Sequence, residues 1–267
     1  MRCPDIMPDV SDTQDPQTRP RGVYWLPNLL TSSALFAGFY AIVAAIDYNF
    51  EKAAIAVFVA MVFDGLDGRV ARWTHTESSF GKEYDSLSDM VSFGLAPAIV
   101  TYQWGVARIT EYGPLWRRFG WLACFFYAAA AALRLARFNS RSAVQDKNYF
   151  EGLPSPSAAA IVAAFIWLVN QLEPTIGLPE LVLAFAVTAC AGALMVSRFA
   201  FNSFKRVDAG ARVRFAHIIL VPVAFAIIAT HPPAALLTLF GAYALSGPLV
   251  WLIRKCRRRG RGGASSS

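Results

Sequence analysis

Apolar runs recur along this 267-residue chain, and they constrain its fold more than any other feature. A helix needs about 20 predominantly apolar residues to cross the hydrocarbon core of a bilayer, and each run approaches that length. The low charged fraction of 16% agrees, because soluble domains contain about 25% charged residues. We therefore expect eight membrane spans, at about 27–46, 52–70, 86–105, 119–136, 157–172, 178–197, 214–231 and 233–253.

The basic residues are distributed unevenly over the loops of this arrangement. An even number of spans places both termini on one side of the membrane. When that side is taken as the cytoplasm, it holds all but four of the 25 Lys and Arg residues. This asymmetry follows the positive-inside rule and predicts cytoplasmic termini. The four exceptions are Lys52, Arg108, Arg117 and Arg118.

Polar segments flank the apolar region. Residues 1–24 contain no apolar run, and we expect them to form a disordered cytoplasmic tail. Residues 254–267, "RKCRRRGRGGASSS", hold a basic cluster that we interpret as a membrane anchor in contact with anionic headgroups. We expect no nucleic-acid partner, because no other feature of the chain supports one.

Four aspartates lie at the expected cytoplasmic edge of the second and third spans. Asp64 and Asp67 are three residues apart, and Asp85 and Asp89 are four residues apart. Both spacings place side chains on one face of a helix, so two antiparallel helices can direct four carboxylates at one volume. Their mutual repulsion favours a bound divalent cation. Oxygen ligands alone select hard cations such as Mg2+ or Mn2+.

Glycines and an arginine accompany these acids. Gly68 and Gly81 leave open helix surface where a bulky ligand can approach the backbone. Arg72 is placed to contact phosphate oxygens. Together with a metal, these residues predict a site for a nucleotide diphosphate. The alternative, ordinary interfacial charges paired with nearby basic residues, would suit one acidic pair better than two, since ionisable groups at membrane depth are usually functional.

The order and spacing of these residues resemble the complete signature of the CDP-alcohol phosphatidyltransferases. The resemblance implies a bundle of six core transmembrane helices, usually in a homodimer, with a metal site that opens to the cytoplasm. It also implies that an alcohol displaces CMP from a CDP-linked lipid. The matching pattern is Asp64-x-x-Asp67-Gly68-x-x-Ala71-Arg72, then eight residues, then Gly81-x-x-x-Asp85-x-x-x-Asp89.

The resemblance also implies a role for each of these residues. Asp64, Asp67 and Asp85 would be metal ligands, and Asp89 would be the general base and also touch a metal. The stretch "LPNLLTSSALFAG" resembles the nucleotide-proximal start of the family's first helix, although helix capping would equally explain its polar residues. The residues expected to bind the CDP-lipid are Asn28, Thr31, Gly68, Ala71, Arg72 and Gly81.

Four further stretches bear on the acceptor alcohol. They are similar to segments of the integral-membrane phosphatidylserine synthases of bacteria, and they read "SDMVSFGLAPA", "ALRLARFN", "FEGLPSPSAAA" and "MVSRFAFNSFK". This implies transfer of a phosphatidyl group from CDP-diacylglycerol to L-serine, whose carboxylate needs cationic donors. For each arginine, positive-inside anchoring is the alternative interpretation. The residues expected to bind serine are Arg134, Arg137, Asn139, Arg198 and Lys205.

Two other functions stay open at this point. The same chemistry with glycerol 3-phosphate or an inositol phosphate as acceptor would also require basic residues. A divalent-cation transporter would also use intramembrane carboxylates, but it would place them near the middle of the bilayer rather than at its edge.

The expected organisation is an all-α, polytopic membrane protein of the bacterial inner membrane, with its active site facing the cytoplasm and its helices in contact with membrane lipids. A disordered tail (1–24) precedes a catalytic core (25–205). Two additional transmembrane helices (206–253) and a basic cytoplasmic tail (254–267) follow.

Overall fold

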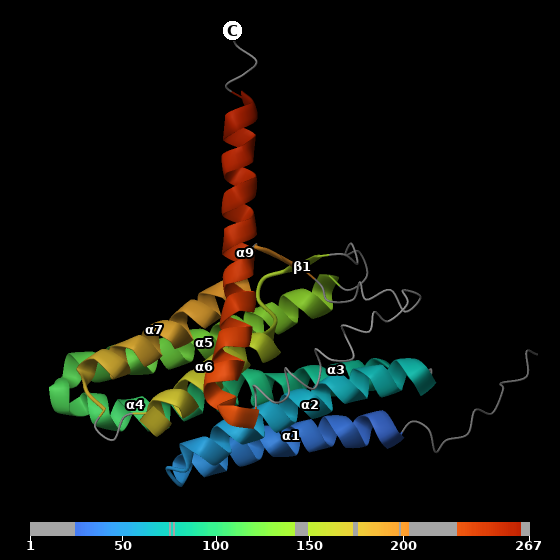
Figure 1. The fold of residues 1–267 in the computed structure, drawn as a ribbon. Helices are drawn as coiled ribbons and strands as arrows, with labels where there is room; N and C mark the ends of the chain where they lie inside the picture. Colours follow the sequence, from blue (N-terminus) through green and yellow to red (C-terminus); the bar gives the residue numbers. More distant parts are fainter. Residues whose placement is uncertain are drawn as a thin grey trace, which may run out of the picture.

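The computed structural model shows long helices that run back and forth, with one further helix lying across them (Figure 1). The expected N-terminal tail lies outside the residues that the structure describes, and so does most of the expected seventh span. The described residues are 25–74, 76, 78–141, 149–172, 176–197, 199–202 and 229–262.

Every other expected span coincides with a helix or a run of helices. The expected third span (86–105) begins in the last turn of α3 (Ser79–Asp89) and continues through a π-helical segment, η2 (Met90–Leu95), into α4 (Ala96–Ile109). A short 3-10 turn, η3 (Thr110–Tyr112), leads on to α5. The other spans are α1 (Trp25–Ile46), α2 (Phe50–Thr74), α5 (Pro114–Arg141), α6 (Ser155–Leu172), α7 (Leu178–Val196) and α9 (Pro232–Gly262).

The prediction of an all-α membrane protein is confirmed, with one small addition. Two three-residue strands, β1 (Tyr149–Glu151) and β2 (Ala200–Asn202), pair antiparallel. By length and composition, α1, α5, α6, α7 and the Pro232–Leu252 part of α9 can each cross a membrane. Large apolar side chains such as Phe36 and Leu133 also remain 71% and 62% exposed. Such an apolar exterior suits lipid rather than water, so this is an integral membrane protein.

Small residues bring α1 close to η2. A Cβ on Gly38 would lie 2.7 Å from the Cα of Ser92, so no larger residue fits there without a shift. Ser92 donates a hydrogen bond to the carbonyl of Ala34 (3.1 Å), and Ser88 donates one to the carbonyl of Thr31 (3.2 Å). Small residues and interhelical hydrogen bonds are what hold helices together in lipid. This seam fixes the end of α3, which carries the second pair of aspartates, against α1.

The two ends of the bundle alternate along the chain. The start of α1, the α2–α3 connection and the end of α5 lie at one end (Figure 1). The α1–α2 and α4–α5 connections, the end of α6 and the start of α7 lie at the opposite end. This alternation is the one that the distribution of basic residues requires, and it places both aspartate pairs at the end where α1 begins.

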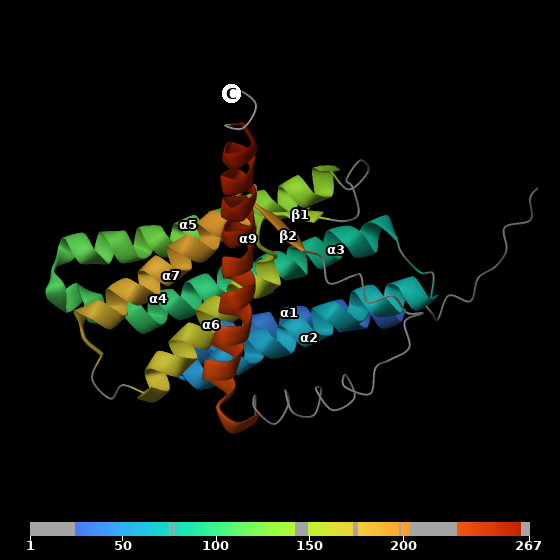
Figure 2. The same cartoon turned by 45° about the horizontal axis from the view of Figure 1, so that its top comes forward.

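α9 does not run parallel to the other long helices. In both views it crosses the other helices rather than running beside them (Figures 1 and 2). It packs against α6 and β2. Hydropathy predicted this helix because it reports length and polarity, but it carries no information on direction. The helix also continues past residue 253 through the basic cluster as far as Gly262.

Candidate active site

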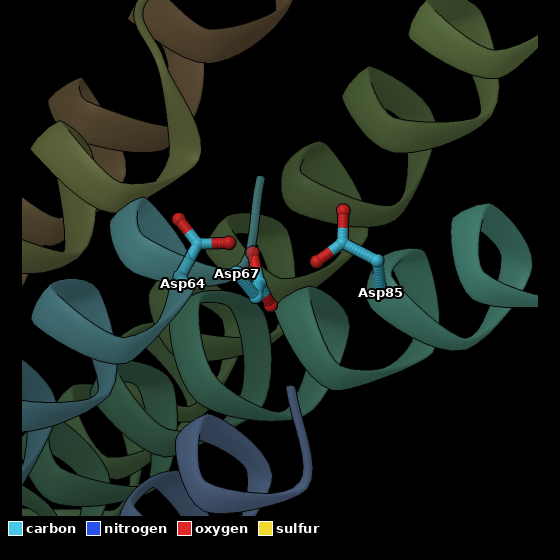
Figure 3. Close-up of side chains that lie close together, drawn as sticks. All are labelled: Asp64, Asp67 and Asp85. Atoms are coloured by element: carbon cyan, nitrogen blue, oxygen red, sulfur yellow. The ribbon is translucent and has the colours of Figure 1, made fainter. Parts of the chain in front are cut away.

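Three of the motif aspartates converge from two helices. Asp64 and Asp67 project from α2 and Asp85 from α3, and their carboxylates point toward one another (Figure 3). Each offers an oxygen, and these oxygens all lie within 4.8 Å of one another. Two ligands on opposite sides of Mg2+ would be about 4.2 Å apart, because each bond is about 2.1 Å long. The cluster can therefore hold a hard divalent cation after a small adjustment of the side chains.

Asp89 lies one turn farther along α3 and stands outside this three-residue cluster. Its carboxyl group lies within hydrogen-bonding reach of that of Asp64, a contact that requires a proton on one of the two. Asp89 is also the last residue of α3, directly before the π-helical segment. π-helical segments frequently occur at functional sites, where they offset the side chains that follow. Asp89 thus adjoins the cluster through Asp64, and its part in metal binding stays a prediction.

The carboxylate cluster is electrostatically strained without a cation. Asp85 precedes the expected third span, so it lies at the aqueous edge of the bundle. Burial, and then the neighbouring charges of Asp67 and Asp64, raise the pKa of Asp85 to about 7. A bound cation would reverse this effect, because it favours the ionised carboxylate.

Thr31 positions one of these ligands. Its Oγ1 lies 2.7 Å from Oδ2 of Asp67 and 3.1 Å from the carbonyl oxygen of Pro27. A hydroxyl has one proton, so the shorter contact with the carboxylate is the favoured acceptor. α1 begins at Trp25, so Thr31 is inside the helix and the helix-capping interpretation is wrong for it. Its hydroxyl instead fixes the orientation of Asp67, which is itself buried.

A pocket of about 520 Å³ opens beside the aspartates. Asp67 and Asp85 belong to both the pocket and the carboxylate cluster, so a ligand in the pocket would meet the metal. Every residue predicted to bind the CDP-lipid lines this pocket. They are Asn28 and Thr31 from α1, Gly68, Ala71 and Arg72 from α2, and Gly81 from α3.

The two glycines of the pocket differ in their surroundings. A Cβ on Gly68 would meet no other atom within 4 Å, so this face of α2 is open, as predicted. A Cβ on Gly81 would lie 3.1 Å from Oγ of Ser78 and 3.6 Å from Oδ1 of Asn28. Gly81 therefore also lets the first turn of α3 lie close to α1.

Part of the pocket wall was not predicted from the sequence. Ser78 caps α3, because its Oγ accepts a hydrogen bond of 3.0 Å from the backbone N–H of Gly81. A serine three residues before the motif glycine was the available signal for this cap. The additional lining residues include Thr76, Ser78, Ser79 and Phe138.

The geometry agrees with comparisons with known proteins. A family model described as CDP-alcohol phosphatidyltransferase matches residues 24–197, which include all helices from α1 to α7. The chain belongs to the CDP-alcohol phosphatidyltransferase family. The protein is therefore an enzyme, and the alternative of a divalent-cation transporter is wrong.

Several similar members of this family have named activities. A CDP-diacylglycerol–serine O-phosphatidyltransferase of Helicobacter pylori is 36% identical over 231 residues, which cover 86% of this chain and 92% of that protein. One of Mycobacterium leprae is 33% identical over 85% of this chain and 70% of its own length. An archaetidylserine synthase of Methanothermobacter thermautotrophicus is 39% identical over 52% of this chain and 57% of its own length.

In this CDP-alcohol phosphatidyltransferase, two of the sequence stretches expected to bind the acceptor meet beside Asp89. Arg134 of α5 lies within electrostatic range of Asp89. Its Nη1 donates a hydrogen bond of 2.8 Å to Oγ of Ser155, at the start of α6. The "RLARFN" and "GLPSP" stretches are thus joined by one hydrogen bond. Ser155 was not singled out from the sequence, although it lies inside the second stretch.

The "GLPSP" stretch is held in place by the end of α7 and by Phe199, the residue before β2. Gly152 has a φ of 86°, a conformation that favours glycine, and a Cβ there would clash with the carbonyl oxygen of Met195. Its N–H donates to the carbonyl of Phe199 (2.9 Å), and the N–H of Leu153 donates to that of Leu194 (3.0 Å). These contacts fix the position of the start of α6.

The remaining residues predicted to bind serine have different outcomes. Asn139 donates a hydrogen bond of 2.9 Å from Nδ2 to Oγ of Ser86, the residue after Asp85. Arg137 is partly buried on the same helix. Arg198 and Lys205 lie outside the described residues. The structure therefore brings the α5 residues to the aspartate-bearing end of the bundle.

Proposed function

We propose that this protein transfers the phosphatidyl group of CDP-diacylglycerol to the hydroxyl of L-serine, giving phosphatidylserine and CMP. The observation that carries this proposal is the convergence of three aspartates beside a pocket lined by every predicted CDP-lipid residue. The names of relatives that are similar along most of the chain support serine as the acceptor.

The CDP headgroup would occupy the pocket between α1, α2 and α3. The open surface of Gly68 and the small side chain of Ala71 give the cytidine room, and Arg72 supports the motif or the diphosphate. Asp64, Asp67 and Asp85 would hold Mg2+ or Mn2+. When bound, that cation would offset negative charge on the diphosphate. The acyl chains remain in the bilayer between helices.

Asp89 would act as the general base. It takes the proton from the serine hydroxyl as that oxygen forms a bond to the phosphorus that carries the diacylglycerol. The bond between this phosphorus and the bridging oxygen breaks, and CMP leaves with that oxygen. Asp89 suits the role because it adjoins the cluster through Asp64 and faces Arg134.

The serine acceptor would bind between Asp89 and the end of α5. Its carboxylate requires cationic donors, and Arg134 is a partly buried cation within electrostatic range of the base. Arg137, Asn139, Arg198 and Lys205 would complete the binding site for the ammonium and carboxylate groups, or hold the helices around it.

The same proposal includes the membrane context. The basic residues of the α2–α3 region and of the end of α5 lie toward the end of the bundle that holds the aspartates, and they support a cytoplasmic active site in a bacterial inner membrane. Family membership supports a homodimer. In the proposed organisation, the catalytic core covers residues 25–205, and α9 belongs to the additional C-terminal region.

Substitution of the aspartates tests the assigned roles. Asp89→Asn should abolish most serine-dependent release of CMP while sparing binding of the CDP-lipid. Asp64→Asn should instead move the metal titration to higher concentrations. Near-normal turnover in Asp89→Asn would refute the base assignment, and an unchanged metal titration in Asp64→Asn would refute the ligand assignment.

A further inference from the structure

α9 lies outside the region that the family model matches, yet it packs against the core. The ring of Tyr243 contacts that of Phe201, with 5.7 Å between centroids, and Ala244 beside it is buried. Gly247, one turn later, allows the Phe201 ring to approach, because a Cβ there would clash with it. Phe201 belongs to β2, which pairs with β1. α9 is thus anchored to the strand pair whose first strand, β1, leads into the "GLPSP" stretch.

Tyr243 lies within electrostatic range of the cation of the proposed acceptor site. Arg134 lies within electrostatic range of Asp89, Tyr243 and Tyr127. The hydroxyl of Tyr127 already donates a hydrogen bond to the carbonyl of Phe93 at 2.9 Å. Tyr243 is therefore the phenol that α9 adds to the surroundings of this guanidinium.

Arg134 has more N–H donors than its hydrogen bond to Ser155 uses. A guanidinium has five N–H groups, and it binds a carboxylate best through two parallel hydrogen bonds. One Nη1–H is used by Ser155, and within the described part of the chain Nε is buried with no hydrogen-bond partner. A buried, unpartnered N–H is costly. Its direction must be fixed if it is to meet an incoming carboxylate, since the arginine side chain is long and flexible.

We propose that Tyr243 is a positioning residue for the acceptor. Its hydroxyl holds the Arg134 guanidinium between Ser155 and Asp89, so that the remaining N–H groups meet the carboxylate of serine. α9 thereby completes the acceptor site from outside the family core. This inference rests on the proposed function, because it requires an acceptor alcohol that carries a carboxylate.

Tyr243→Phe tests the inference, because it removes the hydroxyl and keeps the ring against Phe201. The KM for serine should rise about ten-fold, as expected for a lost hydrogen bond to a charged group. The KM for CDP-diacylglycerol and kcat at saturating serine should stay within two-fold of the wild type. Phe240→Leu is the matched control, since Phe240 lies one turn earlier on α9 and packs against Phe58. It should leave both KM values unchanged.

An unchanged serine KM in Tyr243→Phe, or an equal rise in both KM values, would overturn the inference. In an Arg134→Lys background, Tyr243→Phe should add almost nothing, because both changes act through one guanidinium. If the two substitutions instead raise the serine KM independently, so that their effects multiply, the inference would also be overturned. If Tyr243→Phe fails to fold, Tyr243→His replaces it. The imidazole keeps a polar ring, so its serine KM should lie nearer the wild-type value than that of Tyr243→Leu, and equal values would count against the inference.

The activity of the wild-type protein distinguishes a failure of the proposed function from a failure of the inference about Tyr243. If it releases no CMP on addition of serine, the proposed function fails. If it uses serine while Tyr243→Phe keeps the wild-type serine KM, the inference about Tyr243 alone fails.

Discussion

Thr31 offers the sharpest test of how the carboxylate cluster is organised. Thr31→Val replaces a hydroxyl by a methyl group of similar size, so it removes the 2.7 Å hydrogen bond to Asp67 without leaving a cavity. A hydrogen bond to a charged group contributes about 1.5–3 kcal/mol, which corresponds to a roughly 10- to 100-fold change in an equilibrium constant. Losing a residue that orients a metal ligand typically costs the same range in metal affinity.

The assay is a titration of serine-dependent CMP release with Mn2+ or Mg2+. For Thr31→Val, the metal concentration at half-maximal activity should rise about 10- to 100-fold, while activity at saturating metal is largely retained. Thr101→Val is the matched control. Thr101 is also buried, and its hydroxyl also lies within hydrogen-bonding distance of the carbonyl oxygen four residues earlier, that of Pro97, at 3.0 Å. It lies roughly three helical turns beyond Asp89.

A shift of the metal titration in Thr101→Val equal to that in Thr31→Val would show a general effect of losing a buried hydroxyl. An unchanged titration in Thr31→Val would contradict the positioning role. A reduced maximal rate with an unchanged metal requirement would likewise refute it, because the hydroxyl would then act on a step other than cation binding.

Three further predictions follow from individual residues. Gly68→Ala should maintain or raise thermal stability, because a Cβ there meets nothing within 4 Å. It should nevertheless raise the KM for CDP-diacylglycerol, and an unaltered KM would indicate that the lipid does not approach this face of α2. Metal affinity should strengthen up to ten-fold per pH unit below about 7 and level off above it, because the proton on Asp85 competes with the cation; Asp85→Asn should flatten this profile. Gly152→Ala should lower the melting temperature and raise the serine KM, because its Cβ would clash with Met195.

Much of the site could be predicted from the sequence because its spacing is local. Intervals of three and four residues place Asp64 with Asp67 and Asp85 with Asp89 on single helix faces, and the chain between the pairs forms the connection between two helices. The full set of pocket residues came from the resemblance to the family signature. Helix spacing could not show that Asp89 is offset from the other three, because the position of each carboxylate depends on how α2 and α3 pack.

Contacts between distant residues were not predictable in the same way. Thr31 and Asp67 are 36 residues apart, and Arg134 and Ser155 are 21 apart, so helix periodicity does not relate them. The π-helical segment left no recognisable pattern either. Hydropathy predicted the apolar part of α9 but neither its continuation to Gly262 nor its direction across the bundle, and so it gave no sign that Tyr243 lies within electrostatic range of Arg134.

The central claim is that this protein uses serine to displace CMP from CDP-diacylglycerol. The most direct test incubates the purified protein with labelled CDP-diacylglycerol, Mn2+ or Mg2+, and separately L-serine, glycerol 3-phosphate or an inositol phosphate. We expect CMP and phosphatidylserine with serine, and little CMP with the other two alcohols or with Asp89→Asn. Absence of CMP with serine, or faster release with either other alcohol, would contradict the claim.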